Sequence, residues 1–415
     1  MSLNDTPRAN RLHIGIYGKR NAGKSSLINA LTGQDIALVS AEAGTTTDPV
    51  FKSMELHPIG PVVFIDTAGF DDEGSLGKLR VERTKAVMEK TDVAIVVIDG
   101  AAATAADLYA AVPAADLLAD EQLQAEKQWI EQLEEKNIPI IIAINKADLT
   151  SNVSLEGEAS HPIIAVSAAT GEGLDDLRKA IEDAVPEDYM REKILGDIIG
   201  EGDLALLVMP QDIQAPKGRL ILPQVQTIRE LLDRRCTTVA TTADGFERAL
   251  KALNRAPDLI ITDSQCFKQV YAAKPSESAL TSFSVLFAAY KGDIDKFLNG
   301  ASLLDEMTEN SRVLIAEACT HVPLNEDIGR VKIPDLLRKK FGPNIEITNI
   351  CGNDFPNTEE LKNYDLIIHC GACMFNRKHV LSRIASAEAA GVPITNYGVV
   401  MAKLAGILEM ITITK

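Results

Sequence analysis

The most constraining feature of the sequence is a glycine-rich loop between an apolar segment and a helix-forming segment. Residues 12–18, LHIGIYG, have the composition of a buried strand, and the chain continues as KRNAGKSSLINALTG. The pattern Gly18-x4-Gly23-Lys24-Ser25 is that of a phosphate-binding loop. Its backbone amides would surround a phosphate, Lys24 would reach the β and γ phosphates, and the Ser25 hydroxyl would bind Mg²⁺.

Two later strand-like segments end in side chains that suit a nucleotide. PVVFIDTAG carries Asp66, which can hold Mg²⁺ through water, and Gly69, whose amide can meet a γ-phosphate. IPIIIAINKAD carries Asn145, Lys146 and Asp148. A carboxylate at Asp148 accepts hydrogen bonds from N1 and the exocyclic amine of guanine, which adenine does not offer.

A fourth segment, IIAVSAATG, ends in Ser167 and Ala168, which suit a backbone contact with the guanine O6. The phosphate-binding loop between a strand and a helix is a strong signal, whereas each of the three shorter motifs alone is weak. The four motifs in this order, each at a strand end, predict a site for GTP or GDP with Mg²⁺.

Residues ~10–187 resemble the small GTPase domain of the tRNA-modification and Era class. AEAGTTTDPV is similar to switch I of that class, where one threonine closes over Mg²⁺. We assign Thr46 to this role, with Thr45 and Thr47 as alternatives. The resemblance makes Lys24, Thr46 and Gly69 the catalytic residues.

Two positions bear on the rate of hydrolysis. Phe70 stands where Ras-like proteins carry a water-orienting glutamine, so we expect slow, switch-like turnover. Asn21 lies at the position where the resemblance implies K⁺ binding near the phosphates. The other interpretation of Asn21 is a loop residue that tolerates left-handed geometry. Ala22 and Ser26 complete the expected nucleotide contacts.

The bulk composition excludes several classes of protein. The chain has 415 residues, enough for two to four domains, and a formal net charge of −17 that argues against nucleic-acid binding. No segment resembles a signal peptide or a membrane span. Six cysteines are too few for a disulfide scaffold. These properties predict a cytoplasmic protein without a membrane or nucleic-acid partner.

Alternating strand-like and helix-like segments continue to the end of the chain. They predict a P-loop GTPase domain at 1–190, a dimerisation domain at 196–275 and a third domain at 276–415, each α/β with mainly parallel sheets. Residues 184–203 have the composition of a linker. The alanine-rich residues 101–119 are an insertion to which we assign no function. In the middle region Lys217 and Arg219 could form a basic edge.

Cysteines cluster at strand ends in the last third. Strand-like segments end at Cys319, Cys351 and Cys370, and Cys373 follows three residues later. Because successive parallel strands end on the same side of a sheet, these thiols should lie near one crevice. His321 and His369 flank them. The spacing alone allows zinc, an iron–sulfur cluster or a redox dithiol.

Cys319-x-His321 followed by His369-Cys370-x-x-Cys373, behind such a GTPase domain, resembles the HydF family of FeFe-hydrogenase maturation GTPases. The resemblance implies that Cys319, Cys370 and Cys373 bind a 4Fe-4S cluster in a homodimeric scaffold. The scaffold would carry a diiron precursor to apo FeFe-hydrogenase and would work with radical-SAM maturases.

In that family the fourth iron is open to an exchangeable ligand, for which Asp203 and Glu317 are candidates here. His321 and His369 would either bind iron or support the site, and His379 would lie either on the surface or beside the site. We expect Cys351 to be a spectator, and Cys236 and Cys266 to be unligated thiols. The alternative function is a regulatory GTPase with a structural zinc or redox thiol domain.

Overall fold

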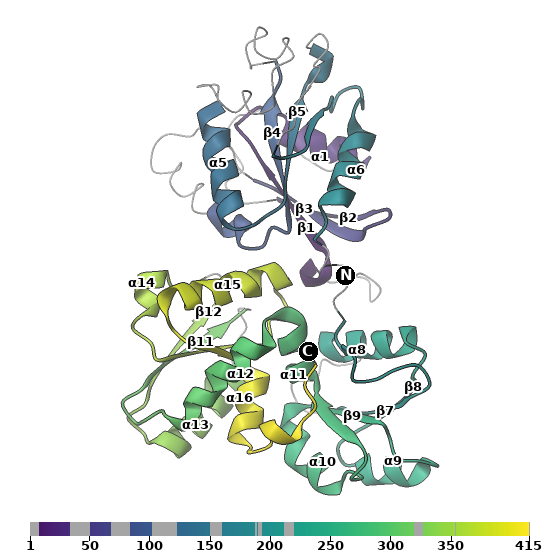
Figure 1. Ribbon diagram of the computed structural model, residues 1–415, viewed down its shortest axis with the longest axis vertical. Helices are drawn as coiled ribbons and strands as arrows, with labels where there is room; N and C mark the ends of the chain where they lie inside the picture. Colours follow the sequence, from purple (N-terminus) through teal and green to yellow (C-terminus); the bar gives the residue numbers. More distant parts are fainter. Residues whose placement is uncertain are drawn as a thin grey trace. The chain divides into compact units, whose positions relative to one another are not determined.

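The computed structural model describes residues 8–33, 50–67, 84–101, 123–149, 160–186, 189, 193–210, 220–318, 327–352 and 354–414. The chain divides into two compact units, Met1–Arg191 and Glu192–Lys415. Figure 1 shows the helices and strands of each unit.

The first unit contains a six-stranded sheet in the order β2-β3-β1-β4-β5-β6. Only β2 runs antiparallel to its neighbour. The strands are β1 (Leu12–Tyr17), β2 (Val50–Leu56), β3 (Gly60–Asp66), β4 (Val93–Asp99), β5 (Ile140–Asn145) and β6 (Ile163–Ala165). Strands β1, β4 and β5 are mostly apolar and are buried along nearly their whole length, because helices cover the sheet on both faces.

Two hydrophobic cores fill the space between this sheet and its helices. Helices α1 (Lys24–Thr32) and α6 (Leu174–Ala184) pack on one face, and α5 (Gln124–Glu135) packs on the other (Figure 1). Short 3-10 turns at Arg8–Asn10 and Ala147–Leu149 flank strands of this sheet. The parallel strands therefore end at one common edge, which carries the loops.

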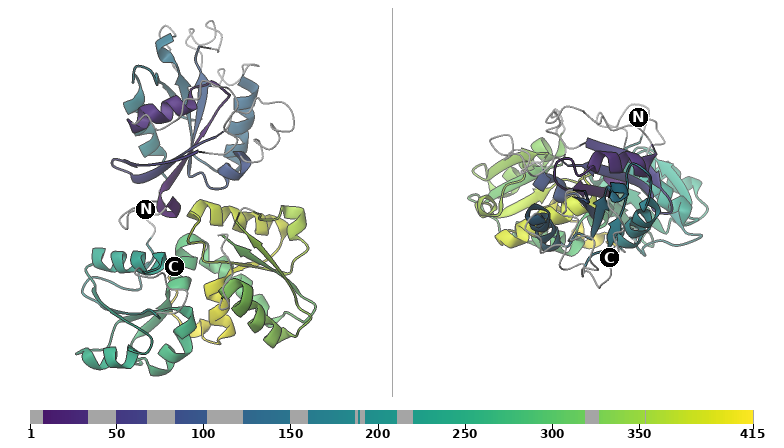
Figure 2. Two further views of the ribbon diagram at one scale, coloured as in Figure 1. Left: turned by 180° about the vertical axis from the view of Figure 1, so that it is seen from behind. Right: turned by 90° about the horizontal axis from the view of Figure 1, so that it is seen from above.

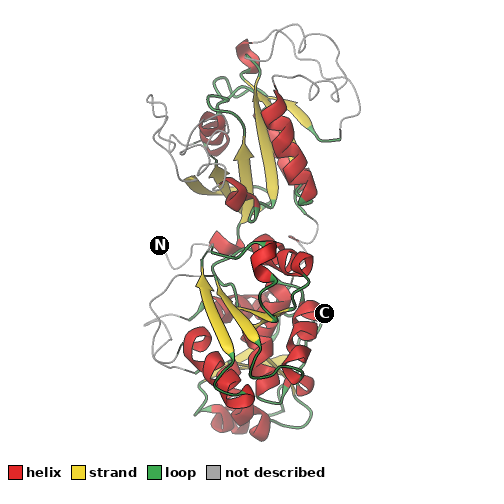
Figure 3. Cartoon of the chain, turned by 90° about the vertical axis from the view of Figure 1, so that its left-hand side faces the viewer, coloured by secondary structure: helices red, strands yellow, loops and turns green. Residues whose placement is uncertain are grey.

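The second unit contains two four-stranded sheets, ordered β10-β9-β7-β8 and β12-β11-β13-β14, with all strands parallel. Figure 3 separates its helices from its strands by colour. The strands are β7 (Leu204–Val208), β8 (Thr237–Thr241), β9 (Leu259–Thr262), β10 (Ala279–Ser282), β11 (Arg312–Glu317), β12 (Glu346–Cys351), β13 (Leu366–His369) and β14 (Ile394–Asn396).

Helices connect these strands and cover them. The α-helices are α8 (Leu222–Asp233), α9 (Phe246–Ala252), α10 (Phe267–Ala273), α11 (Phe283–Lys291), α12 (Ile294–Ser302), α13 (Ile333–Phe341), α14 (Thr358–Leu361), α15 (Arg377–Ala390) and α16 (Tyr397–Leu404). Shorter helical turns lie at Ser264–Cys266, Leu303–Asp305, Ile328–Lys332 and Leu408–Met410.

The two sheets repeat one topology. In each, the second strand of the chain lies on one side of the first, and the third and fourth lie on the other side. One polar interaction recurs at the same place. Asp258 Oδ2 accepts the N–H of Leu204 at 2.7 Å, and Asp365 Oδ2 accepts the N–H of Arg312 at 2.7 Å. Each aspartate therefore satisfies the first backbone donor of its central strand.

The segments after these aspartates also correspond. They read LIITDSQC after Asp258 and LIIHCGAC after Asp365. The strand register pairs Val208 with Thr262 in the first sheet and Ala316 with His369 in the second. The first sheet thus has Asp263 and Cys266 where the second has Cys370 and Cys373.

Each half of the second unit also covers part of the other half. Ala402, Ile407 and Ile411 from the second half pack into the core of the first sheet, while Ala288 from α11 packs into the core of the second. The Thr412 N–H donates to Leu280 O at 2.7 Å. Helices α11, α12 and α16 lie between the two sheets (Figures 1 and 2).

The expected fold class, a P-loop GTPase domain followed by α/β structure with mainly parallel sheets, is confirmed. Strands β2 and β10 lack strong patterns and were not expected. The segment predicted as a linker is partly packed: Ile194, Leu195 and Ile199 are buried in the core beside α8. Its glycines form turns rather than a free connection. Within the described part of the chain, no helix has both the length and the apolarity needed to cross a membrane.

The Asp258 interaction predicts a pH-dependent stability. The Leu204 N–H, together with Arg255 at 2.6 Å, holds the pKa of Asp258 below its usual value, so its contribution is present above about pH 4 and is lost as the pH falls further. Asp258→Asn should lower the free energy of unfolding by about 1 kcal/mol at neutral pH, since the side chain is partly exposed.

Urea unfolding between about pH 3 and pH 7 checks this. The difference between Asp258→Asn and the unsubstituted protein should shrink towards pH 3. Asp233→Asn, which removes an exposed pair with Arg229, is the control and should change little. An equal difference at every pH would contradict the assignment.

Candidate functional site

The phosphate-binding loop joins β1 to α1. Asn21 and Gly23 have φ angles of 63° and 85°, in the left-handed region. A Cβ atom at Gly23 would collide with Nδ2 of Asn145, so only glycine lets the loop lie this close to the end of β5. Lys24 is buried, and its Nζ donates to the carbonyls of Gly18 and Lys19 at 2.8 Å each. The loop therefore curls so that its first carbonyl groups hold the Lys24 ammonium group.

Ser25 and Asp66 form the pair expected at a magnesium site. Ser25 lies in the first turn of α1 and Asp66 ends β3, and the Ser25 hydroxyl donates to Asp66 Oδ2 at 2.5 Å. Burial raises the pKa of Asp66, while Ser25, Lys24 and Lys52 oppose that shift. A hydroxyl at the start of a helix and a carboxylate at the end of the adjacent strand are the oxygen ligands that Mg²⁺ uses in nucleotide sites.

The predicted guanine-binding residues meet at the ends of β5 and β6. Asn145 is buried, donates from Nδ2 to Ala22 O at 2.9 Å, and accepts the Ala168 N–H at 3.2 Å. It therefore ties the phosphate-binding loop to the loop after β6. Ser167 Oγ donates to Asp148 Oδ1 at 2.6 Å, which orients the exposed carboxylate of Asp148.

Lys146 has a partner that the sequence analysis did not assign. Its backbone is left-handed, with φ 65°, and its Nζ lies 2.6 Å from Asp99 Oδ2 at the end of β4. Asp99 is in register with Asn145 on the neighbouring strand. The sequence signal was present, since DVAIVVID also ends a buried strand in a carboxylate.

Some predicted residues fall outside the described part of the chain. They are Thr45, Thr46, Thr47, Gly69, Phe70, residues 102–119 of the insertion, Lys217, Arg219, Cys319 and His321. Ser26 is exposed on the first turn of α1, and Asn21 is exposed on the loop.

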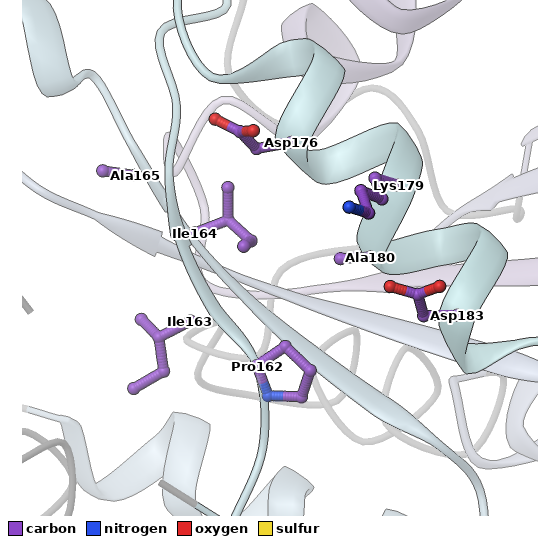
Figure 4. A pocket seen from close by; sticks show the side chains of 8 residues that line it. All are labelled: Pro162, Ile163, Ile164, Ala165, Asp176, Lys179, Ala180 and Asp183. Carbon is purple, nitrogen blue, oxygen red and sulfur yellow. The ribbon is translucent and has the colours of Figure 1, made fainter. Parts of the chain in front are cut away.

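A pocket of about 520 Å³ lies elsewhere on the first unit (Figure 4). Pro162–Ala165 of the β6 region form one wall, and Asp176, Lys179 and Asp183 of α6 form the other. None of the residues assigned to the nucleotide lines it. This pocket is therefore not part of the nucleotide site.

In the second unit, the ends of three adjacent strands carry Glu317, Cys351 and His369. Glu317 is in register with Cys351, and Ala316, the residue before Glu317, is in register with His369. Cys370 follows His369 directly. The expected convergence at one edge therefore holds for these described residues.

Cys370 lies against the segment that leads to Cys319. Its Sγ accepts the N–H of Ala318 at 3.0 Å and the N–H of Ala372 at 3.4 Å. Ala372 has φ 50°, so the loop curls around the sulfur. Two N–H groups directed at one sulfur stabilise the thiolate form that binds metals.

Cys373 is half-buried on the same loop. Burial raises the pKa of the Cys373 thiol, and its backbone environment and Lys291 oppose the shift. Lys291 is buried at the end of α11, and its Nζ donates to Phe375 O at 3.2 Å. A fixed positive charge therefore lies beside the thiol loop.

The predicted flanking residues differ in how they are held. His369 is buried, and burial together with Arg383 lowers its pKa to about 3, so the ring is neutral. Glu317 accepts Arg330 Nε at 3.0 Å. His379 stacks on Phe375 with ring centroids 3.9 Å apart.

The remaining candidates lie on the first sheet of the second unit. Asp203 precedes β7, where its Oδ2 accepts the Gly200 N–H at 2.8 Å. Cys236 precedes β8 and donates to Gly200 O at 3.1 Å. Both therefore lie at the amino ends of their strands. Cys266 is buried after β9.

Three family models match the chain in succession. Residues 13–146 match the 50S ribosome-binding GTPase family, residues 194–292 match the hydrogen maturase F dimerization domain, and residues 295–412 match the hydrogen maturase F tetramerization domain.

Individual relatives match a smaller part. GTPase Der of Wolinella succinogenes is 35% identical over 183 residues, which are 41% of this chain and 35% of the relative. The tRNA modification GTPase MnmE of Chromobacterium violaceum is 34% identical over 169 residues, 40% of this chain and 33% of the relative. The chain thus spans about a third of the length of these curated relatives.

Solved structures give similar partial matches. A probable GTP-binding protein engB is 25% identical with a TM-score of 0.31, covering 42% of this chain and 98% of that chain. Era in complex with MgGDPNP and a segment of 16S ribosomal RNA is 20% identical with a TM-score of 0.34, covering 55% of this chain and 92% of that chain.

The fold and nucleotide site of the first unit define a P-loop GTPase that binds GTP or GDP with Mg²⁺. The two hydrogen maturase models follow it in order and together match more than half of the chain. The chain belongs to the hydrogen maturase F (HydF) family. It carries that family's dimerization and tetramerization domains, which support assembly into oligomers.

The position of Asn145 predicts a loss of nucleotide affinity on substitution. Asn145→Ala removes both hydrogen bonds that join the two loops, so affinity for GDP should fall about 5- to 100-fold. Titration with a fluorescent GDP analogue measures this. Asn29→Ala on α1, outside these loops, is the control. Unchanged GDP affinity in Asn145→Ala would show that the bridge does not organise the site.

Proposed function

We propose that this chain is a GTP-hydrolysing scaffold and carrier in the maturation of FeFe-hydrogenase. It would bind a 4Fe-4S cluster through Cys319, Cys370 and Cys373 and deliver a diiron precursor to the apo-hydrogenase. The family assignment supports the pathway, and the arrangement of the thiols supports the cluster.

The observation that carries this proposal is the contact between Ala318 and Cys370. The N–H of Ala318 donates to the Cys370 sulfur, and Cys319 is the next residue in the chain. The Cys370–Cys373 loop supplies the second and third thiols. Sulfurs from two strand ends of one sheet can thus share one cluster.

The surroundings fit a cluster of thiolate-bound iron. Burial disfavours a free thiolate at Cys373, so metal binding would displace its proton. The N–H groups of Ala318 and Ala372 and the ammonium of Lys291 would offset the negative charge of bound thiolates. When bound, the cluster supplies an iron with a replaceable ligand.

Glu317 and Asp203 differ as sources of that replaceable ligand. Glu317 ends β11 beside Cys351, so it is at the edge where the thiols meet, although Arg330 holds its carboxylate. Asp203 is at the amino end of a strand in the other sheet. Glu317 is therefore the better-placed candidate.

In the first unit, the proposed catalytic roles fall to Lys24, Thr46 and Gly69. Lys24 would stabilise charge on the β and γ phosphates, Thr46 would close over Mg²⁺ and the Gly69 amide would meet the γ-phosphate. Ser25 and Asp66 would hold Mg²⁺. Radical-SAM maturases and apo FeFe-hydrogenase are the proposed partners.

The two sites should be separable by substitution. Lys24→Ala should lower GTP turnover by about 100-fold or more while leaving iron content unchanged. Cys370→Ser should do the reverse, because it removes a ligand but no nucleotide contact. Iron analysis, electron paramagnetic resonance and phosphate release on anaerobically reconstituted protein measure both.

Cys266→Ser is the matched control, since Cys266 occupies the corresponding position of the first sheet. It should keep both iron and turnover. A colourless protein with stoichiometric zinc would instead support a regulatory GTPase with a structural metal site. Loss of iron in Lys24→Ala would contradict two separate sites.

The potassium proposal is tested at Asn21. If its side chain binds K⁺, exchange of K⁺ for Na⁺ should slow GTP hydrolysis several-fold, and Asn21→Gly should be slow in both salts. Glycine keeps the left-handed backbone, so the variant removes the side chain alone. Equal rates in both salts, or full activity of Asn21→Gly, would rule out this role.

A further inference from the structure

A buried arginine lies beside the thiol loop without having been assigned a role. Arg383 is in the middle of α15 and is 3% exposed. A charged group in the interior is stable only when it is paired or hydrogen-bonded. Its contacts therefore indicate what the arginine holds in place.

The guanidinium of Arg383 joins three segments at the edge of the second sheet. Nη1 lies 3.0 Å from Nε2 of His369, and Nη2 donates to the carbonyl of Gly352, just after β12. Its Cζ lies over the rings of Phe355 and Phe375, at 4.7 Å and 4.6 Å from the ring centroids. This planar arrangement suits arginine and not lysine.

These contacts define the state of the His369 ring. Nδ1 lies 2.8 Å from the carbonyl of Cys370, which can only accept, so Nδ1 carries the proton. Nε2 then has a lone pair, and the guanidinium, which can only donate, binds that lone pair. Both ring nitrogens of His369 are therefore engaged with protein atoms.

His369 in turn holds the backbone of the first thiol of the pair. The Cys370 carbonyl accepts from His369 Nδ1 and also from Asn396 Nδ2 at 3.1 Å. With the carbonyl held on one side, the Cys370 sulfur faces the N–H of Ala318. The orientation of this thiol thus depends on a chain that begins at Arg383.

The first sheet of the same unit provides an internal comparison. It repeats the topology and the backbone bond at this point, since Asp263 N donates to Val208 O as Cys370 N donates to Ala316 O. There Thr262 replaces His369, and α10, FKQVYAA, contains no arginine. The fold therefore does not require the histidine–arginine pair, which occurs with the thiols.

We propose that Arg383 is a positioning residue that keeps His369 out of the iron coordination sphere and uses it to orient Cys370. This inference rests on the proposed cluster site and specifies the role of one of its flanking histidines. The imidazole holds the backbone of Cys370 and does not bind iron. The iron that no thiolate binds therefore remains available to another ligand.

The test compares reconstituted, reduced clusters by pulsed electron paramagnetic resonance on protein labelled with ¹⁵N-histidine. The unsubstituted protein and His369→Gln should show the same strongly coupled nitrogens. Both contain His321, so a coupling from His321 would appear equally in both and would not affect the comparison. Arg383→Met should free Nε2 and give a new strong coupling that is absent in the double variant Arg383→Met/His369→Gln. A strong coupling in the unsubstituted protein that disappears in His369→Gln would overturn the inference.

A second measurement does not depend on new ligation. Arg383→Met should increase the rate of cluster loss to a chelator by about 10-fold. Arg383→Lys can still donate to Nε2, so its rate of cluster loss should lie between those of Arg383→Met and the unsubstituted protein. Cluster retention equal to that of the unsubstituted protein in Arg383→Met would overturn the positioning role. If no cluster forms in the unsubstituted protein, the proposed function itself fails, so the two failures are distinguishable.

Discussion

The carboxyl ends of parallel strands meet at one edge of a sheet, and this constraint underlies every site described here. In the first unit it brings together the loop after β1, Asp66, Asp99 and Asn145. In the second unit it brings together Glu317, Cys351 and His369. Because loops at such an edge pack on buried strands, polar groups far apart in the chain become neighbours on a rigid support.

The second unit uses this support twice. Its two sheets share strand order, the aspartate that binds the first N–H of the central strand, and helices exchanged across the middle. In the first sheet Asp263 and Cys266 follow β9, and in the second sheet Cys370 and Cys373 follow the corresponding strand β13. The same strand order can therefore carry different chemistry, since different side chains follow the corresponding strands.

Most of the nucleotide site could be predicted because its residues lie in short motifs at fixed spacing. Local backbone geometry, which the sequence encodes directly, places the residues from Gly18 to Ser25 and from Asn145 to Asp148. Asp99 was missed because its partner Lys146 follows a different strand, and a carboxylate at a strand end does not by itself show that pairing. The packed turn at Ile194–Ile199 was missed because glycine and charge resemble a linker even when α8 buries the apolar residues between them.

The sequence by itself determined the α/β class, the phosphate-binding loop, the guanine motif and the presence of paired thiols, because each depends on near neighbours in the chain. Only the tertiary structure decided which side chains meet across strands. It placed the segment before Cys319 against Cys370 and engaged both nitrogens of His369 through Arg383. Such contacts depend on strand order and register, which no single segment of sequence contains.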